Sequence, residues 1–218
     1  MGTDVRAITD DELGRWGDAM WRGFHHETVE GWADFARPDF ELSRTTAAFD
    51  RDRVVGTLRS FASSLTVPGG AMIPSAALTN VTVAPTHHRQ GLLRRMLEPD
   101  LAAAKERGEP VGMLIAAEFP IYGRFGYGSA ADHTEYEIDA RTVEFTQPGT
   151  GSVELVDAAG LRKEAPALYD RLRRVQPGFI ERDDRWWDRT LQITPTPGDK
   201  PYKGYLAIHR NDAGEAEG

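Results

Sequence analysis

The residues best placed to do chemistry lie between a predicted strand and a predicted helix. An apolar, β-branched run over residues 78–83 stops at Pro85, and leucines and methionine at helical spacing follow Gly91. A helix start offers backbone N–H groups without intrahelical partners, beside the positive end of the helix dipole. Gly91 lets a phosphate approach the backbone, and Arg89 and Arg94 add positive charge. We therefore expect this turn to bind a pyrophosphate.

The turn differs from two common phosphate-binding motifs, because the sequence has neither G-x-G-x-x-G nor G-x-x-x-x-G-K-S/T. It resembles the acyl-CoA pyrophosphate loop of the GNAT superfamily of N-acetyltransferases, whose pattern is Q/R-x-x-G-x-G/A. The six matching residues are His88-Arg89-Gln90-Gly91-Leu92-Leu93. His88 stands where the pattern has Gln or Arg, and Leu93 where it has Gly or Ala. Leucine at that last position is typical of the enhanced intracellular survival (Eis) branch.

A second motif follows a further apolar run, residues 111–116. The superfamily often has Y-x-x-x-G-F/Y at this place, and Tyr122 to Tyr127 fit that pattern. The wider string resembles the Eis-type enzymes in particular; it reads Ile121-Tyr122-Gly123-Arg124-Phe125-Gly126-Tyr127-Gly128. The resemblance is strongest over residues 78–128. It implies an α/β GNAT fold, a mixed central sheet flanked by helices.

The resemblance also implies an activity and a site. The activity is transfer of an acetyl group from acetyl-CoA to a primary amine, with an aminoglycoside or a similar polyamine-like acceptor as first candidate. Tyr122 is implied as the general acid, because a phenol with an ordinary pKa near 10 stays protonated and can protonate the leaving thiolate. Tyr127 is expected to pack. The implied contacts with acetyl-CoA are Val81, Thr82, Val83, Arg89, Gln90, Gly91, Leu92, Leu93, Arg94, Ala117 and Glu118.

Other functions stay open beside this one. The alternatives are a catalytically idle GNAT-like module that binds CoA and a lysine-directed protein acetyltransferase. Eis-type enzymes take their general base from the carboxylate at the full-length C-terminus, to which Gly218 does not correspond, so no base is assigned. The family resemblance further implies a homo-oligomer, a hexamer.

Composition narrows the classes of partner. The net charge of −8 argues against nucleic acid, which needs clustered Lys and Arg. No apolar run is long enough to span a membrane and no signal peptide is evident, so we expect a cytoplasmic protein without a membrane partner. The absence of cysteine excludes disulfides and thiolate chemistry. The six histidines form neither H-x-x-x-H nor H-E-x-x-H, so we expect no metal.

The elements that must position the site follow from patterning. Thr9 and Glu12 form a capping box before a helix carrying Leu13, Trp16, Met20 and Phe24. A second helical segment is expected over residues 27–36. Strands are expected over residues 42–49, 54–67 and 72–83, joined by tight turns and therefore antiparallel. The strand from Val111 follows a helix and should lie parallel to the one ending at Val83. Pro99 should kink or break that helix.

The acceptor side and the C-terminal part are less sharply defined. Six residues lie where the superfamily places acceptor-contacting helices, although a solvated polar face explains them equally well: His25, His26, Glu27, Glu30, Trp32 and Asp34. We expect residues 1–147 to form the acetyltransferase domain, completed by residues 136–145. A Pro/Gly-containing linker over 147–151 leads to residues 148–218, the start of a second, incomplete GNAT-like domain. That domain opens with a strand over 153–156 and a helix. An amphipathic helix with Trp186 and Trp187 follows, and a last strand over 204–210 ends in a hairpin turn without a following partner.

Overall fold

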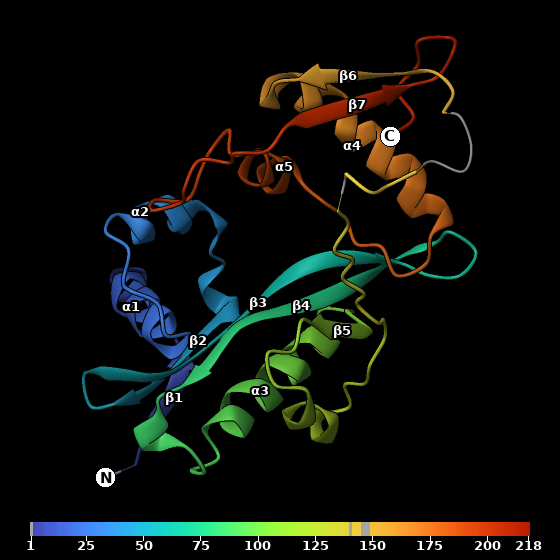
Figure 1. The fold of residues 1–218 in the computed structure, drawn as a ribbon. Coiled ribbons are helices and arrows are strands. Elements are labelled where there is room, and N and C mark those ends of the chain that lie inside the picture. Colours follow the sequence, from blue (N-terminus) through green and yellow to red (C-terminus); the bar gives the residue numbers. More distant parts are fainter. Residues whose placement is uncertain (1, 140, 145–148) are drawn as a thin grey trace.

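The computed structural model describes residues 2–139, 141–144 and 149–218 (Figure 1). Its first sheet contains, in spatial order, β1 (Asp4–Ala7), β2 (Thr45–Asp50), β3 (Arg53–Thr66), β4 (Met72–Val83) and β5 (Val111–Leu114). The first four strands run antiparallel to their neighbours, whereas β5 runs parallel to β4. The parallel pair is connected through helix α3 (Leu92–Glu106), as a parallel crossover requires. The predicted mixed sheet flanked by helices is confirmed.

Helices cover both faces of this sheet, because successive residues of a strand point in opposite directions. On β2, Ala47 packs in one hydrophobic cluster with Trp16 of α1 (Leu13–Gly23), whereas the next residue, Ala48, packs in another cluster with α3. Helix α2 (Trp32–Ala36) lies beside α1 (Figure 1). The sheet is thus held between α1 and α2 on one face and α3 on the other.

The N-terminal helices agree with the sequence in part. The capping box is present, since the Thr9 backbone N–H donates to the Glu12 carboxylate at 3.0 Å just before α1. The second helix is shorter than predicted, because only Trp32–Ala36 is α-helical. Gly31 has φ 75 at its start, and a left-handed residue cannot lie inside a right-handed helix. The prediction of helix over residues 27–31 is therefore wrong.

Two further boundaries differ from the prediction. Strand β2 begins at Thr45, because Leu42–Arg44 form a 3-10 turn. Helix α3 runs without a break through Pro99. Buried Leu97 and Ala104 anchor the helix on either side of the proline, so the packing of α3 tolerates the one lost hydrogen bond. Of the two expected outcomes, a break at Pro99 is wrong, and a kink stays a prediction.

A second unit occupies residues 149–218. Strands β6 (Ser152–Val156) and β7 (Leu206–Arg210) pair antiparallel, and α4 (Ala158–Val175) packs against them. Helix α5 (Asp184–Thr190) carries the buried Trp187, as its predicted aromatic anchor requires. The strand–helix opening of this unit and the tryptophan-bearing helix are confirmed.

The last strand has partners on both edges. Its whole length pairs with β6, and beyond the turn the chain returns so that the His209 backbone N–H donates to Gly218 at 2.7 Å. The Glu217 N–H donates in turn to the His209 carbonyl at 3.0 Å. The expectation of a strand without a following partner is wrong, because residues 216–218 return along one edge of β7, while β6 pairs with the other.

The segment between the two units contains no strand among its described residues. Residues 129–139 and 141–144 form neither helix nor strand, so those positions do not extend the first sheet. Ala140 and residues 145–148 lie outside the described residues, and the first part of the predicted linker is among them. Short 3-10 turns occur at Asp10–Glu12, Arg37–Asp39, Leu42–Arg44, Pro85–His87, Phe119–Ile121 and Gly123–Phe125.

The second unit docks on the far end of β3. The Thr66 N–H donates to the Phe179 carbonyl at 2.8 Å, and the Glu181 N–H donates to the Ser64 carbonyl at 3.0 Å. This edge of β3 extends beyond its pairing with β2, which ends at Arg59. Residues 179–181 therefore take the place of a missing strand and bring the second unit next to the first sheet.

Candidate functional site

The site begins where β4 and β5 stop pairing. Their register runs from Ser75 opposite Val111 to Leu78 opposite Leu114, and no pairing between them is found beyond that point in the described residues. Residues 79–83 of β4 continue to pair with β3 alone. One edge of this stretch of β4 therefore faces a gap, and the two strands splay apart here.

A β-bulge in β4 lies at the same point. The register with β3 shifts between Thr57 and Arg59, and Asn80 has φ 54. The Thr57 hydroxyl donates to the Asn80 carbonyl at 2.7 Å and lies 2.7 Å from the Thr82 hydroxyl. A bulge bends its strand, so β4 turns away from β5 here. Thr57 holds that bend from the neighbouring strand.

A cleft of about 360 Å³ occupies the gap, and we call it the β4–β5 cleft. Tyr122 lines it from the loop after β5, with only 8% of its surface exposed. Burial, and then the nearby Glu118 carboxylate, raise the pKa of the Tyr122 phenol above its ordinary value. The phenol therefore stays protonated at neutral pH. The residues lining the cleft are Phe24, Phe61, Ala77, Leu78, Thr79, Asn80, Val81, Met113, Leu114, Ile115, Ala117, Tyr122 and Ile180.

The basic turn, residues 88–94, presents a row of backbone donors. In the part of the chain that the structure describes, no backbone hydrogen bond of ordinary geometry is found for the six N–H groups from Arg89 to Arg94, and the first bond of the helix is Arg95 N–H to the Gly91 carbonyl at 3.1 Å. Arg89 and Gly91 both have positive φ, 62 and 75. Left-handed residues aim successive N–H groups into one concave surface, a geometry that binds anions.

His88 contributes through its ring. The ring Nε2 lies 2.8 Å from the Val83 carbonyl, so the histidine ties the turn to the end of β4. Histidine at the first position of the pattern thus has a structural role here, which the sequence pattern does not reveal.

Arg94, in the first turn of α3, forms an ion pair. Its guanidinium lies 3.3 Å from Glu98, and both side chains are more than half exposed. An exposed pair of this kind is weak, so Arg94 remains able to bind an anion.

Most of the predicted contact residues fall into two groups. Val81 and Ala117 line the β4–β5 cleft together with Tyr122, and residues 89–94 lie in the basic turn. Val83 and Glu118 are in neither group. Leu92 is 2% exposed, and its side chain belongs to the hydrophobic core, as does much of Leu93. For these two leucines only the backbone is available to a ligand.

Thr82 points the other way. A side chain at Gly23 of α1 would meet Thr82 at 2.5 Å, which places the threonine on the α1 face of the sheet. It lines a separate hollow of about 300 Å³ between α1 and residues 82–86. Thr82 is therefore not among the residues that line the β4–β5 cleft.

Three of the cleft residues that were not predicted as site residues lie outside both motif segments. Phe61 comes from the middle of β3, Ile180 from the second unit, and Phe24 from the end of α1, where its spacing indicates a core residue. Each lies far in sequence from the two motifs, and no local pattern connects them. Docking of residues 179–181 on β3 brings Ile180 to the cleft.

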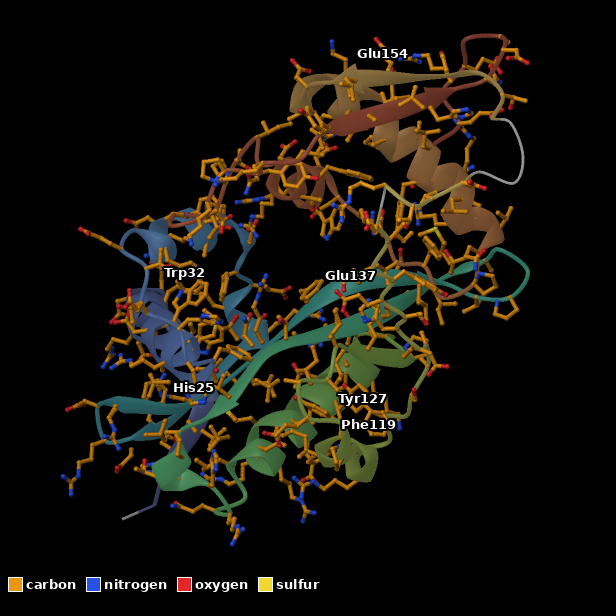
Figure 2. The ribbon with its side chains drawn as sticks, viewed as in Figure 1. His25, Trp32, Phe119, Tyr127, Glu137 and Glu154 are labelled. Carbon is orange, nitrogen blue, oxygen red and sulfur yellow. The ribbon has the colours of Figure 1, made fainter. Side chains whose placement is uncertain are left out.

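The residues suggested for acceptor binding do not line the cleft. Trp32 packs in the core cluster, with its ring stacked 6.3 Å from that of Trp16. Figure 2 shows Trp32 among the side chains of α1 and α2, and Tyr127 and Phe119 beside α3. The other five are solvent-exposed: His25, His26, Glu27, Glu30 and Asp34.

Among the described residues, no helix is long and apolar enough to cross a membrane, and this includes α4, the longest of them. No group of three or more His, Cys, Asp or Glu side chains is arranged to hold a metal ion within these residues.

Comparison with known proteins adds the relationship. The family described as acetyltransferase (GNAT) domain matches residues 4–130. An uncharacterized N-acetyltransferase of Streptomyces avermitilis is 44% identical, over 99% of this chain and 53% of its own length. N-acetyltransferase Eis of Mycobacterium tuberculosis is 38% identical over 79% of this chain and 44% of its own. The crystal structure of Eis1 from Mycobacterium abscessus superposes with a TM-score of 0.79 at 34% identity, over 95% of this chain and 52% of that one. The chain thus spans about half the length of the relatives it matches.

Proposed function

The chain belongs to the acetyltransferase (GNAT) domain family, and on that premise we propose that it transfers an acetyl group from acetyl-CoA to a primary amine. The observation that carries the proposal is the splay after Leu78 and Leu114, with Tyr122 lining the cleft that it opens. An unpaired strand edge beside a buried phenol suits an extended thioester ligand, whose amides pair with the backbone as an added strand would.

In this proposal acetyl-CoA lies across the gap. Its pyrophosphate accepts hydrogen bonds from the free N–H groups of residues 89–94, with Arg89 and Arg94 neutralising charge. Its pantetheine runs along the unpaired edge of Val81 to Val83. The thioester then reaches the bulge at Asn80 and the loop with Ala117 and Glu118.

The transfer step follows from this placement. The amine nitrogen attacks the thioester carbonyl carbon, the C–N bond forms and the C–S bond breaks. A main-chain N–H at the splay stabilises the developing oxyanion. Tyr122 gives its phenolic proton to the leaving thiolate and regains one from solvent. Among the described residues that line the cleft, Tyr122 is the one ionisable side chain, so the attacking amine loses its proton to a group outside this set.

For the acceptor we propose an aminoglycoside or a similar polyamine. Two observations support it: the relatives named Eis, at 38% identity, and the net charge of −8, which attracts polycations. We further propose that residues 1–147 act as the acetyltransferase domain, that residues 148–218 begin a second GNAT-like domain, and that the protein assembles as a homo-oligomer, a hexamer. The family match covers residues 4–130, which lie within the first of these domains.

Thiol release from acetyl-CoA tests the proposal with three acceptor classes: aminoglycosides, linear polyamines and lysine-containing peptides. We expect amine-dependent release, fastest with aminoglycosides, and slowed in Tyr122→Phe. Preference for peptides would replace the acceptor class and leave the chemistry intact. CoA binding without turnover on any amine would instead identify an idle binding module.

A further inference from the structure

Tyr127 lies against the proposed general acid. The rings of Tyr122 and Tyr127 meet edge to face, with centroids 6.0 Å apart and planes at 72°. No hydrogen bond from the Tyr122 hydroxyl to a described protein atom is found, and packing of its ring in the core cluster orients the side chain. An edge-to-face contact restricts the tilt of both rings.

The far end of Tyr127 is fixed by the sheet. A side chain at Gly112 of β5 would place its first carbon 2.8 Å from the Tyr127 hydroxyl oxygen, so that the phenol lies directly on the strand backbone. Gly112 is itself paired with Ala76 of β4, inside the last paired stretch before the splay. The absence of a side chain at position 112 therefore provides the space that Tyr127 fills.

Helix α3 closes the other side. Asp100 accepts a hydrogen bond from the Ser60 hydroxyl at 2.6 Å, which ties α3 to β3. Burial, together with the Asp100 and Tyr122 groups, raises the pKa of Tyr127 to about 12, so the phenol stays neutral in this apolar contact. Tyr127 is thus held by two elements of the core and not by its own loop alone.

We propose that Tyr127 is a positioning residue, which holds the Tyr122 ring so that its hydroxyl faces the β4–β5 cleft, and that Gly112 provides the seat for Tyr127. This inference rests on the proposed role of Tyr122 as general acid. The ring of Tyr127 carries the effect and its hydroxyl does not. Motion of Tyr127 acts on turnover through Tyr122 and leaves the basic turn, and hence acetyl-CoA binding, unchanged.

Four variants separate positioning from general stability. Tyr127→Leu removes the ring, and we expect kcat to fall about 10- to 100-fold, the size of a misplaced catalytic group, with acetyl-CoA affinity unchanged. Tyr127→Phe keeps the ring and should retain the wild-type kcat. Gly112→Ala should lower kcat by displacing the phenol, and Gly112→Ala/Tyr127→Phe should restore it, because the nearest atom left to the new methyl would be a ring carbon at 3.2 Å.

Tyr122→Phe, measured in parallel, distinguishes the two claims. If Tyr122→Phe is slow and Tyr127→Leu is fast, the positioning role is wrong while the proposed function stands. If Tyr122→Phe is itself as fast as wild type, the proposed acid is wrong. Tyr122→Phe/Tyr127→Leu should be no slower than Tyr122→Phe, since Tyr127 acts through Tyr122.

A readout without turnover completes the test. In protein carrying ¹³C-labelled tyrosine, the Tyr122 ring signal should shift in Gly112→Ala and return in Gly112→Ala/Tyr127→Phe. If the Tyr122 signal has the wild-type position in both variants, the inference is overturned, whatever the turnover rates are. A Gly112→Ala defect that Tyr127→Phe does not relieve would do the same.

Discussion

Gly91 and Gly108 form a matched pair of glycines on one helix. Gly91 precedes the first turn of α3 and Gly108 follows its last, with φ 75 and φ 77. A Cβ at either position would have no atom within 4 Å. Replacing either by valine forces a branched residue into the left-handed region, at about 1–2 kcal/mol of stability. The two variants should therefore lose similar stability.

Only Gly91→Val should affect acetyl-CoA. The new side chain would stand in front of the N–H groups of residues 89–94 and displace the pyrophosphate from at least one of them. A hydrogen bond to a charged group contributes about 1.5–3 kcal/mol, so the dissociation constant should rise about 10- to 150-fold. Gly108→Val should bind as wild type. Calorimetric titration at matched temperature, with thermal unfolding of each variant, measures both effects. Equal affinities for wild type and Gly91→Val, or equal losses of acetyl-CoA affinity in Gly91→Val and Gly108→Val, would refute the assignment of the turn.

Three further changes have defined outcomes. Tyr122→Phe should lower kcat about 10²- to 10⁴-fold while acetyl-CoA affinity is retained, as for a lost general acid; wild-type turnover would mean that water supplies the proton. The hydrogen bond from Arg6 lowers the pKa of Glu12 to about 2 from about 4.5. The ionised Glu12 therefore stabilises the fold fully above pH 4.5, and this stabilisation is lost as the pH falls through 2. Glu12→Gln should flatten the denaturant-measured stability profile in that window, and an unchanged slope would exclude this pair as its source. Glu109→Leu leaves the guanidinium of Arg44, 2% exposed, without its partner at 2.7 Å, and should cost about 3–5 kcal/mol in chemical denaturation; a cost below 1 kcal/mol would show that water reaches Arg44.

Local patterns predicted the parts of the site that are contiguous in sequence. The strand, the turn at Gly91 and the start of α3 follow from side-chain spacing and one glycine, and the structure has them where expected. The parallel pairing of β5 with β4 also followed, because a strand that comes after a crossover helix pairs in parallel.

Non-local contacts account for what the sequence did not reveal. Ile180 reaches the cleft only because residues 179–181 occupy an edge of β3 that β2 leaves open. Trp32 has an aromatic ring that could stack on a ligand, but in the structure that ring packs against Trp16 in the core. The position of Tyr127 depends on Gly112 in β5, and no sequence pattern connects that glycine with the tyrosine.

A crystal structure with bound CoA would show whether acetyl-CoA lies across the splay of β4 and β5, as we propose. We expect the pyrophosphate within hydrogen-bond distance of the N–H groups of residues 89–94. The pantetheine should run along Val81 to Val83, with the sulfur beside the Tyr122 hydroxyl. A CoA molecule seated instead in the hollow between α1 and residues 82–86, or with its sulfur remote from Tyr122, would contradict the account.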